Sequence, residues 1–257
     1  MWHYTHRDIV NAFKTVGLKQ GDVVFSHSNI GFFGFPKGER RNENAFETII
    51  GAFFDVIGED GTLVVPTYTY SFPRNEIYNP DTSSSTCGIF SEMLRKDDRS
   101  FRSHDPYISV SAIGKQARLI TDNVPTNSYG IDSFFDRFYK ADGVICNLNF
   151  DAGSTFIHYV ERRLEVPYRF DKTFWGIFEQ GVKRERRKNI VWARREMSDK
   201  FASNMEILHK LAVERNLYRI AHVGRGMIGM ITSHDMFRLI QETLPLYPWF
   251  LTNNHSV

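Results

Sequence analysis

The stretch GVICNLNFDAGSTFIHYVERRL, residues 143–164, decides the fold. Its first six residues are mostly apolar, which predicts a buried strand over Gly143–Leu148. Gly153-Ser-Thr then opens a helix that is expected to run to about Leu164. Strand-like and helix-like segments alternate in this way along nearly the whole chain, which favours the α/β class.

The other expected elements follow from hydrophobic spacing and from capping and turn residues. A capping box at Thr5–Asp8 begins a helix that ends at Gly17, and Ser233 is expected to cap a last helix that ends before Pro245. Further strands are expected at 22–26, 62–66, 109–113, 218–223 and 227–232, and further helices at 44–57, 89–94, 115–120 and 199–214.

Two segments lack such a period. Residues 67–87 are rich in Tyr, Ser, Thr, Asn and Pro and are expected to form a long surface loop, a kind of loop that is often functional. Residues 166–195 mix aromatic and basic side chains. We therefore expect a single domain over 1–257 that carries an inserted, substrate-binding flap at about 166–195.

Composition narrows the class of protein. The chain has 257 residues, with 42% hydrophobic and 24% charged, which is ordinary for a globular domain. No apolar run approaches the roughly 18 residues of a membrane span, and the N-terminus lacks the apolar core of a secretory signal. With only Cys87 and Cys146, neither a disulfide framework nor a cysteine zinc site is expected. We expect a cytoplasmic protein with no metal and no membrane partner.

Two further patterns are weak. The run GRGMIG at 224–229 matches a dinucleotide fingerprint, but a strand follows it where a helix is required, so a hairpin turn is favoured. Between Lys183 and Arg195 there are seven basic residues and one acid, Glu185. This run is either a solvated face or a surface for an anionic ligand. Nucleic acid is a remote alternative, because no DNA- or RNA-binding signature is present.

His158 and Glu161 stand three residues apart on the expected helix, so they share one face. A carboxylate so placed can orient an imidazole for general-base catalysis. In a chain of this composition, chance alone is expected to place about one histidine and one acid at this spacing. The pair by itself therefore leaves a structural role open.

Five segments, read together, resemble the aminoglycoside 3-N-acetyltransferase-like family. They are HSNIGFFG at 27–34, TLVVPT at 62–67, RSHDPYIS at 102–109, TFIHYVE at 155–161 and HVGRGMIGMITSHDMF at 222–237. The resemblance covers nearly the whole chain in the family's order. It implies a mixed sheet flanked by helices and an N-acetyltransferase that uses acetyl-coenzyme A and no metal.

The resemblance also implies roles for particular residues. His158 is expected to be the catalytic base and Glu161 its partner. Apart from the resemblance, Asn149 is a candidate oxyanion donor because it lies just past the strand and near the helix of His158. A histidine with a pKa of ~6.5 can accept the proton of an amine that attacks the thioester directly. Coenzyme binding is expected at His27, Ser28, Asn29, Ile30, Gly31, Arg102, Ser103 and Ser109.

One departure suggests a particular branch. Asp105 precedes Pro106 where the aminoglycoside enzymes usually have histidine, and PTYTYSF at 66–72, Asp132-Ser133 and VPYRFDK at 166–172 look like relatives that acetylate nucleotide-linked 3-amino-3,6-dideoxyhexoses. Aminoglycosides are polycations, whereas 166–195 is basic and aromatic, which suits an anionic nucleotide. A nucleotide-linked amino sugar is thus the expected partner, with an aminoglycoside as the alternative and a homo-oligomer left open. Its expected contacts are Thr67, Tyr68, Tyr70, Asp132, Tyr168, Arg169 and Lys172.

Overall fold

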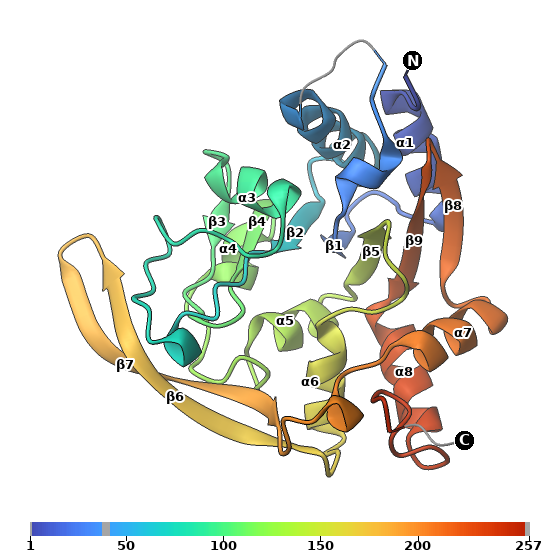
Figure 1. The fold of residues 1–257 in the computed structure, drawn as a ribbon. Coiled ribbons are helices and arrows are strands. Elements are labelled where there is room, and N and C mark those ends of the chain that lie inside the picture. Colours follow the sequence, from blue (N-terminus) through green and yellow to red (C-terminus); the bar gives the residue numbers. More distant parts are fainter. Residues whose placement is uncertain (1, 38–41, 255–257) are drawn as a thin grey trace.

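A central sheet organises the molecule, and a computed structural model describes it for residues 2–37 and 42–254 (Figure 1). Seven strands lie in the order β3-β4-β2-β1-β5-β9-β8. The central pairs β1–β2 and β1–β5 are parallel, and the outer pairs are antiparallel. The expected mixed sheet is therefore confirmed. The strands are β1 (Val23–Phe25), β2 (Thr62–Pro66), β3 (Phe101–Arg102), β4 (Val110–Gly114), β5 (Val144–Leu148), β8 (Arg219–Val223) and β9 (Gly226–Thr232).

Successive strand residues point to opposite sides of the sheet, so buried apolar residues lie on both faces. Helices cover both faces. Val24 belongs to one buried cluster and its neighbour Phe25 to the other. The first cluster lies under α1 (His6–Val16), α2 (Asn42–Ile57) and α3 (Ile89–Lys96). The second lies under α4 (Ala117–Thr121), α5 (Phe134–Lys140), α6 (Phe156–Arg163), α7 (Glu206–Glu214) and α8 (Ser233–Thr243).

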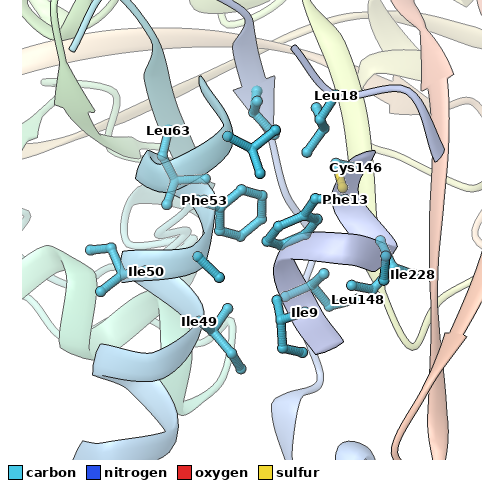
Figure 2. Packing of buried hydrophobic residues seen from close by; sticks show 14 of the residues in the cluster. Ile9, Phe13, Leu18, Ile49, Ile50, Phe53, Leu63, Cys146, Leu148 and Ile228 are labelled. Carbon is cyan, nitrogen blue, oxygen red and sulfur yellow. The ribbon is translucent and has the colours of Figure 1, made fainter. Parts of the chain in front are cut away.

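Figure 2 shows the packing between α1, α2 and the sheet. The rings of Phe13 and Phe53 stack with their centroids 4.1 Å apart. Both rings are fully buried, in the same cluster as Leu63 and Cys146. Each such side chain contributes about 1.5–3 kcal/mol on leaving water. The Cys146 thiol is thus part of the core, and burial raises its pKa.

Residues 166–195 form a long hairpin of β6 (Arg169–Gln180) and β7 (Lys183–Arg194), the curved arm at the lower left of Figure 1. It pairs with no strand of the main sheet. Residues 72–78 hold it: the backbone N–H of Tyr78 donates to Ile177 O at 2.9 Å, and the ring of Phe72 fills the space beside Gly176. The aromatic and basic character of this segment was evident from the sequence, but its strands were not.

Several element boundaries correct the expectations from sequence. Residues 67–87 are irregular, with a short 3-10 helix at Phe72–Arg74, and only part of them lies at the surface: residues 74–77 are exposed, whereas Tyr68, Phe72 and Tyr78 are buried. The sequence prediction also omitted α5. The turn at Gly224, whose φ is 58°, joins β8 to β9 as a hairpin, as expected.

Two helix starts also differ from the prediction. The helix expected over 199–214 is a 3-10 turn at Asp199–Phe201 followed by α7, which starts only at Glu206. The side chain of Asn204 accepts the N–H of Glu206 and ends the irregular stretch. The cap of α8 is Thr232, whose hydroxyl accepts the N–H of Asp235, and Ser233 is the first helical residue.

Candidate active site

His158 and Glu161 meet on α6, one turn apart. The Nδ1 atom of His158 lies 2.7 Å from Oε2 of Glu161. Because an ionised carboxylate can only accept, Nδ1 carries the proton and Nε2 is left as the basic nitrogen. The side chain of His158 is 20% exposed and that of Glu161 is fully buried. Nε2 makes no hydrogen bond within the described part of the chain.

The Glu161 carboxylate is held from a second side. The Tyr168 hydroxyl donates to Oε1 at 2.9 Å, and Nε of Arg169 lies 2.8 Å from Oε2 as an ion pair that is not well directed for a hydrogen bond. Burial by itself would raise the pKa of Glu161, but the charges and hydrogen bonds of His158, Arg169 and Tyr168 outweigh it and lower that pKa. The carboxylate is therefore ionised at neutral pH.

The imidazole of His158 is correspondingly neutral. Burial lowers its pKa most, the positive charge of Arg169 lowers it further, and Glu161 partly offsets both. The edge of the Tyr129 ring packs against it at 5.8 Å between centroids. A neutral imidazole with one fixed N–H is the form that a general base needs.

His158 faces a cavity of about 420 Å³ between the hairpin and the body of the domain. Larger cavities exist, including one of about 660 Å³ beside Arg95 and Arg118, but His158 does not line that one. Among the described residues that line the His158 cavity there is no Asp or Glu. Its charged and aromatic lining consists of Arg169, Lys172, Arg194, Arg195, Tyr70, Tyr107, Tyr129, Phe170, Phe174 and Trp192.

The expected coenzyme segment 27–31 lies at the amino end of α6. Nε2 of His27 is 3.0 Å from Oγ of Ser154 and 3.4 Å from the N–H of Thr155, a residue that also lines the His158 cavity. Burial lowers the pKa of His27 to about 4, so its ring is neutral. A Cβ at Gly31 would meet nothing within 4 Å. Open space thus lies beside Gly31, and contact of this segment with coenzyme stays a prediction.

The backbone around this segment is fixed by its neighbours. The Ser28 hydroxyl bonds that of Ser26 at 2.9 Å, and the N–H of Asn29 donates to Leu148 O at 2.9 Å. Ile30 is buried in a 3-10 helix, Ile30–Phe33. Asn149 spans the same region: Nδ2 donates to Asn29 O at 2.9 Å, and Oδ1 accepts the N–H of Met227 at 2.8 Å. Asn149 therefore positions the segment and does not line the His158 cavity.

Arg102, Ser103 and Ser109 are used inside the protein. The guanidinium of Arg102 donates to Thr67 O at 2.7 Å and also to two carbonyls of residues 80–83. Ser103 Oγ accepts the N–H of Val110, and Ser109 Oγ donates to Thr67 O. These contacts brace residues 67–83 against β4, and a direct contact of the three side chains with coenzyme stays a prediction.

The expected substrate residues are only partly brought together. Tyr70, Arg169 and Lys172 line the His158 cavity. Thr67 and Tyr68 are buried outside its lining, and Tyr168 bonds Glu161. The expectation for Asp132 is not supported by the geometry: it sits at φ 64° in an exposed turn and pairs with Arg137 at 2.9 Å, away from this cavity.

Sequence reasoning missed Tyr107, Tyr129 and Arg194 in the cavity wall. For Arg194 a signal existed. Arg169 and Arg194 face each other in the hairpin register, so recognition of the two strands would have placed both at one site. Tyr107 and Tyr129 come from loops, and only the tertiary contacts bring them to His158.

A neutral, oriented imidazole at the wall of a cavity is the arrangement that general-base catalysis needs, as in transfer of a group onto a nucleophile that must lose a proton. Comparison with known proteins makes the class specific. The chain belongs to the aminoglycoside 3-N-acetyltransferase family, whose sequence model matches residues 26–245. It is thus an acetyltransferase, as expected.

Individual relatives agree with this assignment. The chain is 28% identical over 242 residues to aminoglycoside N(3)-acetyltransferase VII of Streptomyces paromomycinus, covering 85% of this chain and 82% of that one. It is 25% identical over 186 residues to aminoglycoside N(3)-acetyltransferase III of Pseudomonas aeruginosa, covering 65% and 66%. The chain therefore spans just under two thirds of the Pseudomonas enzyme.

Solved structures show the same fold. The crystal structure of aminoglycoside acetyltransferase AAC(3)-Xa has a TM-score of 0.79 at 21% identity and covers 93% of both chains. AAC-IIIb, solved as a binary complex with CoASH, has a TM-score of 0.81 at 17% identity and covers 94% of this chain and 97% of that one. The expected fold class is confirmed.

Among the described residues, no helix is long and apolar enough to cross a membrane. Nor do the His, Cys, Asp and Glu side chains of that part of the chain gather in a group of three or more that could hold a metal ion.

Proposed function

We propose that this protein transfers the acetyl group of acetyl-coenzyme A to an amine of an amino sugar, with His158 as general base. One observation carries the proposal: Nδ1 of His158 is fixed by Glu161 at 2.7 Å while Nε2 is left free on a ring that lines a cavity. We include in the proposal a cytoplasmic location for the enzyme.

The chemistry follows from the protonation states. The amine attacks the thioester carbonyl and gives its proton to Nε2 of His158, so a C–N bond forms as the carbonyl becomes an oxyanion. The C–S bond then breaks and the thiolate leaves; its conjugate acid has a pKa of ~8.5 if cysteine is a fair guide, so it needs little acid assistance. Glu161 stabilises the imidazolium while it exists.

The substrate has two candidates. The relatives named above are aminoglycoside acetyltransferases, and family membership favours an aminoglycoside. The cavity lining favours an anion, because Lys172, Arg194 and Arg195 line it without a carboxylate among the described lining residues. The fourth lining cation, Arg169, is already paired with the buried Glu161. This cationic lining is the specific observation that supports the nucleotide-linked amino sugar expected from sequence. Its nucleobase would lie beside Tyr70, Phe170 or Trp192.

A thiol-release assay with both substrate classes separates the candidates. If the substrate is an anionic sugar nucleotide, Lys172→Ala should raise the KM of the sugar nucleotide, because the Coulomb attraction of the exposed Lys172 ammonium for the phosphates is lost. The KM of acetyl-coenzyme A should not change. Turnover of aminoglycosides with none of the nucleotide amino sugars selects the alternative. Turnover of neither class contradicts an amino sugar as substrate.

The base is tested by His158→Asn, which should lower kcat on the order of 10²–10⁴-fold with the fold retained. The matched control is His234→Asn: His234 is 48% exposed, pairs with Asp142 and lies outside the cavity. Near-wild-type turnover of folded His158→Asn contradicts the assignment.

A further inference from the structure

The buried carboxylate of Glu161 connects His158 to the first residues of the hairpin. Oε2 lies 2.7 Å from His158 Nδ1 and 2.8 Å from Arg169 Nε, and Oε1 accepts the Tyr168 hydroxyl. Arg169 is the first residue of β6, and Tyr168 directly precedes it. Both are almost fully buried, at 3% and 5% exposed, so neither is free to wrap around a substrate.

The far side of Arg169 is also engaged. Its Nη2 donates to Ser203 Oγ at 2.8 Å, in the segment before α7, and its Nη1 donates to Trp192 O at 3.3 Å, in β7. A single guanidinium therefore connects α6, both hairpin strands and the chain that precedes α7. Because these contacts fix the guanidinium, its charge stands at one place beside the Glu161–His158 pair.

We propose that Tyr168 and Arg169 are positioning residues for the base: they fix the Glu161 carboxylate that orients His158, and Arg169 supplies the counter-charge that sets how readily the ring accepts a proton. This assignment rests on the proposed function, and it replaces the expectation that these two residues bind the sugar nucleotide. The hairpin residues within 169–174 and 191–195 that line the cavity lie at the end nearest the body of the domain, and at this same end Tyr168 and Arg169 hold the Glu161–His158 pair.

The positive charge of Arg169 stabilises the charged form of Glu161 and destabilises the charged form of His158. A positive charge near Glu161 favours the carboxylate, and near His158 it disfavours the imidazolium. Arg169 accordingly contributes to lowering the pKa of both groups. The charged and titratable groups around His158 are Glu161 on α6, Tyr168 just before β6, Arg169 in β6, Arg194 on β7 and Tyr129 before α5. The same cavity is also lined by Tyr70, Tyr107, Lys172 and Arg195.

The test measures the titration of His158 in two ways: by NMR of the labelled imidazole and by the pH profile of kcat/KM. Removing the charge with Arg169→Met should raise the pKa of His158, so the acid limb moves to higher pH and activity at pH 6 falls more than activity at pH 8. Arg169→Lys should restore most of the wild-type position. Lys172→Met is the matched control, because it removes a cation of the same cavity that does not contact Glu161, and it should leave the His158 titration in place.

Tyr168→Phe tests the other donor and keeps the ring that packs on Trp249 at 5.2 Å. Loss of one hydrogen bond to a charged group should lower kcat about tenfold and leave the KM of acetyl-coenzyme A unchanged. An unshifted His158 titration in Arg169→Met overturns the assignment for Arg169. If Arg169→Met does not fold, a wild-type kcat in Tyr168→Phe overturns the positioning role.

These outcomes are distinguishable from failure of the proposed function. The NMR titration reports the environment of His158 whether or not the ring is the base. If His158→Asn keeps full activity while Arg169→Met shifts the titration, the base assignment fails and the electrostatic coupling stands. If His158→Asn is inactive and Arg169→Met titrates like the wild type, the reverse holds.

Discussion

Replacing Glu161 by glutamine removes one buried negative charge while nearly preserving the volume of the side chain. The glutamine oxygen can occupy the place of Oε2, 2.7 Å from His158 Nδ1, and its NH₂ can donate to the Tyr168 hydroxyl, which then accepts. The His158 tautomer is thereby retained. What is lost is the charge that stabilises the imidazolium in the transition state.

The magnitude follows from that geometry. A hydrogen bond to a charged group contributes about 1.5–3 kcal/mol and one between neutral groups about 0.5–1.5 kcal/mol. Loss of the charge with the hydrogen bond retained therefore costs about 1–1.5 kcal/mol, and kcat should fall roughly 5–13-fold. Because the Glu161 charge raises the pKa of His158, its removal should lower that pKa and move the acid limb of kcat/KM to lower pH. The same change leaves the Arg169 guanidinium buried without its counter-ion, which should lower the free energy of unfolding by roughly 3–5 kcal/mol.

The assay is steady-state thiol release from pH 5.5 to 9, with urea unfolding at pH 7.5 on the same samples. The direction of the pH shift is the discriminating result, since it is opposite to that expected for Arg169→Met, and general loosening of the site predicts no such opposition. A kcat within threefold of wild type, or an acid limb that moves to higher pH, would refute the reasoning.

Two further predictions concern the scaffold. Gly176→Ala places a methyl group against the buried ring of Phe72 and should loosen the hairpin from residues 72–78. The KM of the amine substrate should rise, and limited proteolysis within 169–194 should become faster. Unchanged proteolysis and kinetics would contradict the packing. Phe13→Ala removes the ring stacked on Phe53 and should lower the free energy of unfolding by about 3–5 kcal/mol in a urea titration, with kcat of the folded fraction unchanged; a loss under 1 kcal/mol would argue against a close-packed α1–α2 contact.

The sequence by itself determined the local elements and one functional pair. The capping box at Thr5 and the glycine turn at Gly224 each specify their structure through contacts within a few residues. His158 and Glu161 are likewise joined by helical geometry alone, because residues three apart on a helix are neighbours. For such features no distant part of the chain is needed.

Only the tertiary structure decided what surrounds that pair. Residues 67–87 look polar and open in sequence, yet Tyr68, Phe72 and Tyr78 are buried, and Arg102 and the hairpin contact the segment. Tyr168 and Arg169 look like ligands for an anion, yet packing turns them inward onto Glu161. A polar or charged side chain is stable in the interior only where distant residues supply its partners, and those partners are set by packing and not by local periodicity.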